Sequence, residues 1–235
     1  MTLTPAQLAA MLDSTNLRLD ASEADIEQLC IEAATHRFAC VMIYPTSVLL
    51  AARILAGTGL RIGTVIGFPS GRFSTGAKAA EITASHKAGA QEVDIVMNYP
   101  ALLGGHSVAV ATEVATLTHL AHKQGQLIKV IVETCFLDDA DRLEAFKICE
   151  DAGADFIKTS TGFGTAGAKI ADIAAWVAAR REPIQLKASG GIKTLADARM
   201  FIDAGATRLG TSSAAAIVAE LAGASVSESA TGGSY

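Results

Sequence analysis

The chain has 235 residues, of which 50% are hydrophobic and 18% are charged, and its formal net charge is −5. This composition allows one large buried core but argues against binding to nucleic acid or acidic membranes, and no apolar run reaches the roughly 20 residues of a membrane-spanning helix. The N-terminus has no secretory signal and no two of the four cysteines have the spacing of a zinc or redox motif, so we expect a cytoplasmic protein. The chain also lacks a cluster of histidines and carboxylates at metal-ligand spacing, and we expect no metal or other cofactor.

Segments typical of strands and of helices alternate from one end of the chain to the other. A short first helix begins at Pro5, because Thr4 supplies an N-cap and proline suits the first helical position. The apolar segments that follow predict eight strands, at residues 12–17, 38–44, 61–68, 92–97, 128–134, 154–158, 184–188 and 208–210. Each is followed by a segment that predicts a helix, at residues 22–36, 47–56, 81–88, 104–124, 138–152, 166–181, 195–204 and 214–222.

A short repeat supports one unit used several times. The sequence Ala-Gly-Ala joins a helix to the next strand at residues 88–90, 152–154 and 204–206. Alternating strands and helices indicate a parallel sheet, and eight units in this length predict a closed (β/α)8 TIM barrel with a short extra N-terminal helix. A doubly wound open sheet is the alternative, but no Gly-x-Gly-x-x-Gly follows the first strand. We therefore expect a single barrel domain over residues 1–223 and a flexible C-terminal tail over residues 224–235, which are small and polar.

Lys158 follows the apolar segment Ala154–Ile157 directly. A lysine in an apolar strand is costly to bury in its charged form, so burial lowers its pKa and makes a neutral amine available. A neutral amine attacks carbonyl groups and forms Schiff bases. The alternative is a lysine whose side chain extends from the end of the strand into solvent.

Other polar side chains lie where neighbouring strands end, which is the side of a barrel that carries the active site. Asp94 stands between Val93 and Ile95, and it is either a buried ion-pair partner or a proton carrier beside a reactive amine. Lys187 lies on the strand after that of Lys158, and a second ammonium nearby lowers the pKa of the first. The remaining candidates at strand ends are Asp13, Thr15, Lys129 and Glu133.

Two glycine-rich loops predict a phosphate site. Gly190 and Gly191 follow the seventh strand, and Gly210 with Ser212 and Ser213 follows the eighth and opens a helix. Backbone N–H groups at a helix N-terminus bind anions, and barrels often place phosphate at these two loops. A tight turn without a ligand is the alternative for the two adjacent glycines.

Taken together, these segments resemble the deoxyribose-phosphate aldolases over nearly the whole chain. The resemblance rests on five motifs, at residues 66–71 (IGFPSG), 92–96 (EVDIV), 129–134 (KVIVET), 153–162 (GADFIKTSTG) and 186–192 (LKASGGI). It implies a class I, metal-free aldolase that reversibly cleaves 2-deoxy-D-ribose 5-phosphate to acetaldehyde and D-glyceraldehyde 3-phosphate.

The resemblance also implies roles for particular residues. Lys158 forms the Schiff base, Lys187 perturbs it, and Asp94 serves the proton relay. Some members of the family also end in a tyrosine that reaches the active site and assists proton transfer, which would be Tyr235 here; a flexible tail whose final tyrosine has no role is the alternative. Substrate and phosphate would be held by Asp13, Thr15, Lys129, Thr161, Gly162, Gly190, Gly191, Gly210, Ser212 and Ser213. The expected partners are small phosphosugar and aldehyde substrates, with assembly as a homodimer or other homo-oligomer.

Three positions depart from the pattern of many relatives: Ser14 replaces a histidine, Met42 a cysteine, and Phe163 a lysine that would add a phosphate charge. None of these touches the set of two lysines and an aspartate. A different Schiff-base barrel enzyme acting on a phosphosugar, and a catalytically silent sugar-phosphate-binding protein, are the two open alternatives.

Overall fold

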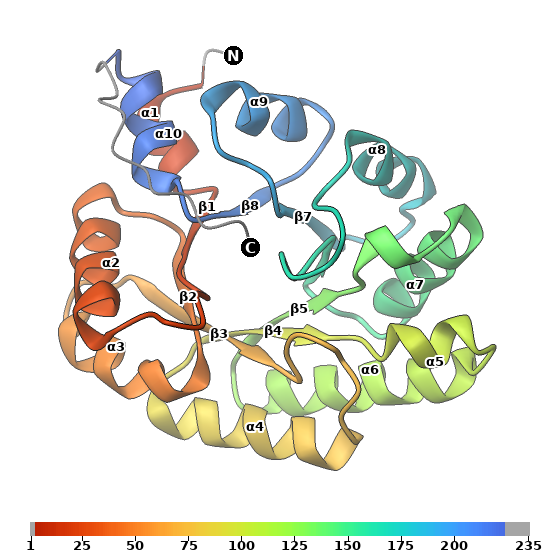
Figure 1. The fold of residues 1–235 in the computed structure, drawn as a ribbon. Helices are drawn as coiled ribbons and strands as arrows, with labels where there is room; N and C mark the ends of the chain where they lie inside the picture. Colours follow the sequence, from red (N-terminus) through yellow and green to blue (C-terminus); the bar gives the residue numbers. More distant parts are fainter. Residues whose placement is uncertain (1–2, 224–235) are drawn as a thin grey trace.

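The computed structural model describes residues 3–223, and eight parallel strands form a closed barrel at its centre (Figure 1). Each strand pairs with the next in the chain, and β8 pairs with β1 to close the ring. The strands are β1 (Leu12–Thr15), β2 (Cys40–Ile43), β3 (Arg61–Ile66), β4 (Glu92–Val96), β5 (Leu127–Ile131), β6 (Phe156–Lys158), β7 (Gln185–Ser189) and β8 (Arg208–Thr211). The predicted (β/α)8 barrel is therefore confirmed.

Helices surround the barrel, and the extra N-terminal helix α1 lies beside α10 (Figure 1). The α-helices are α1 (Pro5–Ala9), α2 (Glu23–His36), α3 (Val48–Ile54), α4 (Thr75–Ala88), α5 (Tyr99–Leu103), α6 (Ser107–Lys123), α7 (Asp139–Asp151), α8 (Ile170–Ala179), α9 (Leu195–Asp203) and α10 (Ala214–Leu221), with 3-10 turns η1 (Pro45–Ser47) and η2 (Thr134–Phe136). No helix within residues 3–223 is both long enough and apolar enough to cross a bilayer.

Side chains alternate along each strand between two buried regions, the lumen of the barrel and the layer between the strands and the helices. In β4, Val93 and Ile95 belong to the large apolar core between strands and helices, whereas the fully buried Glu92 and Asp94 face the lumen of the barrel. The outward set supplies the hydrophobic stabilisation of the fold. The inward set is unusually charged, and it carries the chemistry described below.

Several predicted boundaries differ from the structure. The helix that contains residues 81–88 begins earlier, at Thr75, where Ser74 caps it by accepting a hydrogen bond from Ala77 N at 3.2 Å. The segment 99–103 forms an additional helix, α5, that the sequence did not indicate, and α6 starts only at Ser107.

The expectation of a helix from Ala166 is wrong, because α8 begins at Ile170. Residues before it run along the loop after β7, where Ala168 N donates to Ser189 O at 3.1 Å and to Gly190 O at 3.2 Å. A Cβ on Gly167 would lie 2.2 Å from Gly190 O. This close approach of two backbones is possible only with glycine and excludes a helix there.

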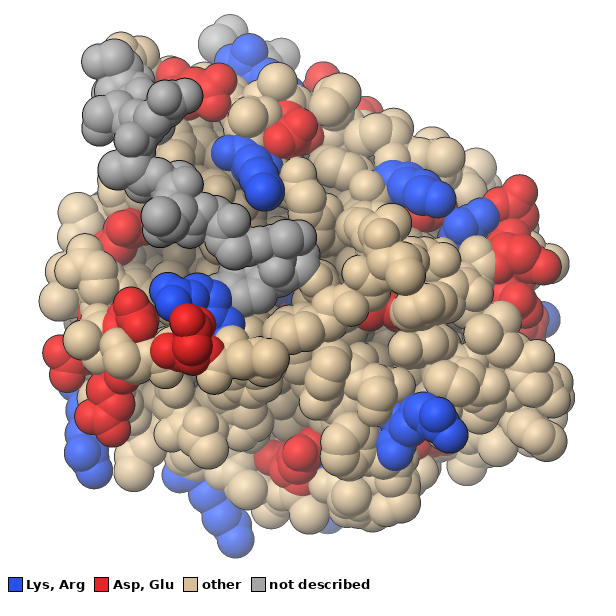
Figure 2. Space-filling model, viewed as in Figure 1, with Lys and Arg blue, Asp and Glu red and all other residues tan. Residues whose placement is uncertain are grey.

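Charged side chains on the face seen in Figure 2 form small separate groups of both signs among uncharged residues. The described part of this face therefore offers no extended basic surface.

Candidate active site

Lys158 is the last residue of β6, and its side chain is almost completely buried in the lumen. The strand parity that buries Ile157 in the outer core turns Lys158 inward. Its Nζ donates a hydrogen bond to Asp94 Oδ2 at 2.8 Å. The alternative of a side chain extending into solvent is thereby wrong, although the amine still borders the cavity described below.

Lys187 stands next to Lys158 in the register of β6 and β7. Its Nζ donates to the same oxygen, Asp94 Oδ2, at 2.8 Å, and also to Asp13 Oδ2. One carboxylate oxygen therefore bridges the two lysines. Asp94 is both an ion-pair partner and a group in position to carry a proton between them.

Burial lowers the pKa of Lys158 to about 8, and the Lys187 ammonium lowers it as well, while the Asp94 carboxylate opposes the shift. Burial alone would raise the pKa of Asp94, but the ammonium groups of Lys129, Lys158 and Lys187 hold it well below its usual range. The site thus pairs a carboxylate that is ionised at neutral pH with an amine that is partly neutral there.

Lys129 and Asp13 were expected to bind substrate, but they lie deeper in the barrel, below the cavity. Lys129 Nζ contacts Asp94 Oδ1 at 2.7 Å and Glu92 Oε2 at 2.6 Å, and both Lys129 and Asp13 are fully buried. Neither borders the cavity above Lys158. Glu92 and Arg208, for which the sequence suggested no role, complete this lower set of charges.

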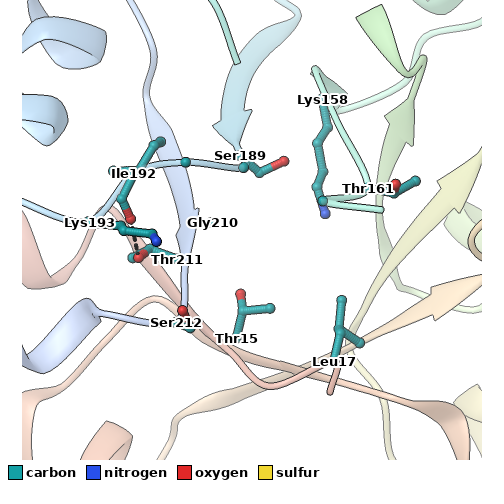
Figure 3. Close-up of a pocket in the computed structure, with 13 residues that line it drawn as sticks. Thr15, Leu17, Lys158, Thr161, Ser189, Ile192, Lys193, Gly210, Thr211 and Ser212 are labelled. Carbon is teal, nitrogen blue, oxygen red and sulfur yellow. Dashed lines mark hydrogen bonds between the residues drawn. The ribbon is translucent and has the colours of Figure 1, made fainter. Parts of the chain in front are cut away.

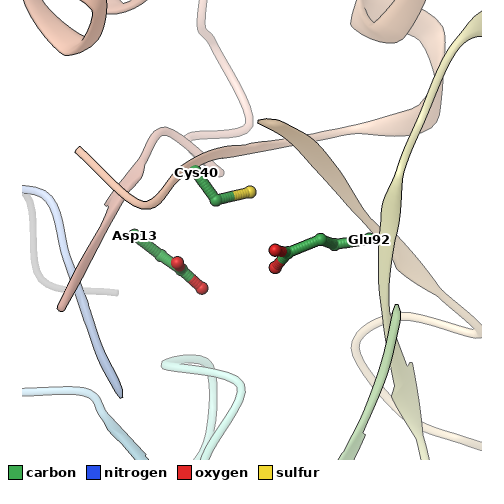
Figure 4. Close-up of side chains that lie close together, drawn as sticks. All are labelled: Asp13, Cys40 and Glu92. Carbon is green, nitrogen blue, oxygen red and sulfur yellow. The ribbon is translucent and has the colours of Figure 1, made fainter. Parts of the chain in front are cut away.

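Asp13, Cys40 and Glu92 converge inside the barrel with their ligand atoms within 4.8 Å of one another (Figure 4). Such a cluster resembles a metal site, but both carboxylates already accept bonds from lysine and arginine side chains. Burial raises the pKa of the Cys40 thiol well above its usual value, as do the neighbouring carboxylates, which disfavours the thiolate that a metal would bind. We interpret the cluster as part of an ion-pair network.

A cavity opens above the Lys158 amine at the carboxyl ends of the strands (Figure 3). Its lining combines hydroxyl groups with glycine-rich backbone, from strands and loops of β1, β6, β7 and β8. The lining residues are Thr15, Leu17, Lys158, Thr161, Gly162, Ser189, Gly190, Gly191, Ile192, Lys193, Gly210, Thr211 and Ser212. Most of the predicted binding residues therefore meet here, together with Lys158.

The end of the cavity away from Lys158 has the features of an anion site. Gly190 and Gly191 have φ values of 85° and 82°, which glycine adopts without strain. The N-terminus of α10 has no side-chain cap, so its backbone N–H groups remain available to an anion. Ser213 N donates instead to Thr211 Oγ1 at 2.9 Å, and Ser213 does not line the cavity.

Lys193 brings a cation to this end of the cavity (Figure 3). It was not among the predicted site residues, because it is exposed and lies in a loop rather than in a periodic element. Its position directly after Gly190-Gly191-Ile192 was the available signal. An ammonium here complements the negative charge of a phosphate group.

The hydroxyl residues after Lys158 divide into two roles. Thr159 Oγ1 donates to Ser189 O at 3.2 Å, and Ser189 Oγ donates to Ser160 O at 2.6 Å, which locks the ends of β6 and β7 together. Thr161 borders the cavity, and its N–H and hydroxyl both donate to the Glu133 carboxylate.

Glu133 was expected in the fifth strand, but β5 ends at Ile131 and Glu133 adopts a left-handed backbone with φ of 55°. Burial raises the pKa of its carboxyl group, although the bonds from Thr161 oppose the shift. Glu133 thus supports the loop after β6 and does not point into the cavity from a strand.

Aromatic side chains from the segments after β2, β3 and β6 pack against one another. Phe68 makes edge contacts with Tyr44 and Phe163, at centroid distances of 5.9 and 5.2 Å. Met42 is fully buried beside Leu17. Phe163 therefore packs in an aromatic group. Tyr235 lies outside the described residues.

Comparisons with known proteins agree with this geometry. A family model described as DeoC/LacD family aldolase matches residues 8–226. The deoxyribose-phosphate aldolase of Carboxydothermus hydrogenoformans is 42% identical over 214 residues, covering 90% of this chain and 94% of the relative. That of Desulfitobacterium hafniense is 44% identical over 214 residues, covering 90% and 97%. The tetrameric deoxyribose phosphate aldolase structure from Aeropyrum pernix superposes with a TM-score of 0.87 at 33% identity, covering 93% of this chain and 92% of the other.

Proposed function

The chain belongs to the DeoC/LacD family of aldolases, and from this premise we propose that it cleaves 2-deoxy-D-ribose 5-phosphate reversibly to acetaldehyde and D-glyceraldehyde 3-phosphate. The observation that supports this most directly is the buried Lys158 amine, which shares a carboxylate with Lys187 and borders a cavity with an anion-binding end.

The first step is attack of the neutral Lys158 amine on the aldehyde carbon of the open-chain sugar. The nitrogen forms a bond to that carbon, and loss of water from the resulting carbinolamine gives a protonated imine. A pKa of about 8 leaves about a tenth of the amine unprotonated at pH 7. Burial therefore supplies a nucleophile that an exposed lysine would rarely present.

Cleavage then needs one proton removed and one added. A base takes the proton of the C3 hydroxyl as the C2–C3 bond breaks, and the electron pair of that bond moves into an enamine on Lys158. Protonation of C2 and hydrolysis of the imine release acetaldehyde. Asp94 Oδ2, bridging Lys158 and Lys187 at 2.8 Å each, is in position to relay these protons.

The phosphate occupies the other end of the cavity. Backbone N–H groups near Gly162, Gly190 and Gly191, the N-terminus of α10, and the Lys193 ammonium provide complementary groups there. Holding the phosphate fixes the distance between the aldehyde carbon and Lys158, which reduces the entropic cost of the reaction.

Trapping the imine tests this assignment. Acetaldehyde with borohydride should leave an ethyl group on Lys158, which peptide mapping by mass spectrometry detects. Label on Lys187 in its place, with Lys158→Ala still active, would reverse the assignment. Competition between acetaldehyde and other donor aldehydes distinguishes this reaction from that of another phosphosugar aldolase, and full activity in chelator is expected of a metal-free enzyme.

Assembly and location form a separate part of the proposal. The tetrameric relative from Aeropyrum pernix supports a homo-oligomer. The unpaired thiols of Cys30, Cys40, Cys135 and Cys149 are typical of a reducing compartment such as the cytoplasm. Light scattering on the purified protein measures the first of these, and cell fractionation the second.

A further inference from the structure

Glu92 and Arg208 lie at the beginnings of β4 and β8, beneath the groups that border the cavity. Neither lines the cavity above Lys158, so neither is in position to touch substrate. Both are nevertheless placed inside the barrel, where charged side chains are costly to bury. Their position calls for a role other than binding.

Their contacts are with other charged groups. Glu92 Oε2 accepts from Lys129 Nζ at 2.6 Å and lies 3.5 Å from Arg208 Nη1, while Glu92 Oε1 accepts from Arg61 Nη1 at 3.3 Å. Arg208 Nη1 donates to Asp13 Oδ1 at 2.7 Å, and its guanidinium group lies 5.3 Å from the centre of the Phe156 ring.

These contacts continue upward to the reactive amine. Lys129 contacts Asp94 Oδ1, and Asp13 accepts a bond from Lys187. Asp94 and Lys187 in turn are the charged neighbours of Lys158. Glu92 is therefore linked to Asp94 through Lys129, and Arg208 is linked to Lys187 through Asp13. The interior of the barrel screens these charges poorly.

Six charged groups inside the lumen balance one another when Lys158 is neutral; this count leaves out the half-exposed Arg61 and Glu133 at the rim. Among residues 3–223, Asp13, Glu92 and Asp94 contribute three negative charges to the lumen. Three positive charges come from Lys129, Lys187 and Arg208. A proton on Lys158 adds a seventh charge that none of these six groups compensates, although the Glu133 carboxylate at the rim also interacts with it.

We propose that Glu92 and Arg208 are positioning residues that, by fixing the net charge of the lumen, set the fraction of Lys158 present as neutral amine. This inference rests on the proposed role of Lys158 as the imine-forming residue. It assigns the lower layer a function in nucleophile activation that is separate from substrate binding.

Each strand of the barrel brings a titratable or charged side chain toward the lumen or its rim. Arg61 is half exposed, so water screens its charge more than the others. The Cys40 thiol stays neutral because burial raises its pKa. The titratable and charged groups that face the lumen or its rim are Asp13 (β1), Cys40 (β2), Arg61 (β3), Glu92 and Asp94 (β4), Lys129 (β5), Glu133 (after β5), Lys158 (β6), Lys187 (β7), Lys193 (after β7) and Arg208 (β8).

The test uses Glu92→Gln, Arg208→Gln and the double variant, whose lumen charge equals that of the original protein. Each protein is exposed briefly to acetaldehyde and cyanoborohydride between pH 5.5 and 10.5, and the ethyl label on the Lys158 peptide is quantified by mass spectrometry. The pH midpoint of labelling is expected to fall by about one pH unit in Glu92→Gln and to rise by about one in Arg208→Gln. The double variant should return close to the original midpoint.

Shifts of the labelling midpoint in opposite directions indicate an electrostatic role. Loss of packing would instead move the midpoint in the same direction in both single variants. Midpoints that stay in place, or that move in the same direction in both single variants, would overturn the inference. Arg208→Lys, which retains the charge, should keep the original midpoint. If the original protein carries no label on Lys158, the proposed function itself fails, so the two failures are distinguishable.

The inference can still be tested if one of the variants fails to fold. If only one single variant folds, its midpoint is compared with that of the double variant, and a difference of about one pH unit is still expected. If neither single variant folds, Arg61→Gln changes the charge next to Glu92 from a half-exposed position and should raise the midpoint by about 0.3 pH unit. No rise would then overturn the inference.

Discussion

The two ends of the candidate site are built from different parts of the chain. At the lysine end, the working groups are charged side chains on rigid strands, each buried and held by at least one ion pair. At the anion end, the groups are mostly backbone N–H in glycine-rich loops, with one exposed lysine. Catalysis thus depends on a fixed arrangement of charges, whereas substrate binding depends on backbone conformation. Changes at the lysine end should therefore lower kcat, and changes at the anion end should raise KM.

Removing the nucleophile should have the largest effect. Lys158→Ala is expected to lower kcat by about 10⁴-fold or more, as loss of a covalent catalyst does elsewhere. Lys158→Arg should be equally inactive, because a guanidinium group stays protonated and cannot form the imine. Steady-state rates with 2-deoxyribose 5-phosphate measure both. Activity within tenfold of that of the original protein in either variant would contradict the role of Lys158 as nucleophile.

Asp94→Asn should come next, with a loss in kcat of about 10²- to 10³-fold through the proton relay. It also changes the pH dependence in a defined direction. The Asp94 carboxylate raises the pKa of Lys158, so its removal leaves burial and Lys187 unopposed, and the pKa should fall below the original value of about 8. The midpoint of imine formation measured against pH should move to more acidic values, and a move to more basic values would exclude this cause.

Deletion of Tyr235, which lies outside the described residues, should lower turnover of the phosphorylated substrate about tenfold, on the order of 1.4 kcal/mol. The expected cause is the loss of a phenol that, as the resemblance to the aldolases implies, would assist proton transfer. Tyr235→Phe separates the hydroxyl group from the ring and should show most of the loss. Unchanged kcat in both variants would exclude a role of the tyrosine in proton transfer, and an unchanged melting temperature would show that the barrel is intact.

Gly191→Ala examines the anion end. The residue has φ of 82°, and no atom lies within 4 Å of the position that an alanine methyl group would take, so the cost is backbone strain of about 1 to 2 kcal/mol. KM for 2-deoxyribose 5-phosphate should rise about five- to tenfold, with kcat and the KM for unphosphorylated 2-deoxyribose little changed. Gly59→Ala is a matched control, because its φ is 75° and its surroundings are also open, but it lies away from the cavity. An equal rise in KM in the control would mean that strain, not anion binding, is responsible.

Lys193→Met should have the smallest effect, because its side chain is exposed and water screens its charge. KM for the phosphorylated substrate should rise about three- to fivefold at low salt, and the difference should shrink as salt is added. Lys123→Met removes another exposed lysine, from the end of α6 and away from the cavity, and should leave KM unchanged. A rise that is independent of salt would argue for a packing role.

Strand positions were largely predictable from the sequence. Lys158, Lys187 and Asp94 stand in strongly apolar segments, where alternation alone decides which side chains face the lumen. All eight strands exist where the pattern predicts them, with boundaries shifted by a few residues. The roles of these residues stay predictions until the kinetics are measured.

The features that the sequence did not disclose depend on backbone turns or on distant partners. Glu133 leaves the strand pattern because its backbone becomes left-handed, and Gly167 is needed for the close contact with Gly190. Glu92 and Arg208 resemble charges at the exposed start of a strand, and only closure of the barrel shows that they face inward. Sequence periodicity describes the direction of a side chain, and it does not specify which partner the side chain meets.

Closure of the barrel through Asp13 has a consequence for synthesis and folding. The carboxylate near the start of the chain is neutralised by Lys187 and Arg208, which follow it by 174 and 195 residues. A nascent chain that lacks β7 and β8 lacks both counter-charges, and burying Asp13 with only Lys129 nearby, at 3.7 Å, would be strongly unfavourable. We infer that the lumen cannot become dry and ordered until the last strands have left the ribosome. Folding of the interior should thus be a late, cooperative event, even though each strand–helix unit is local in sequence.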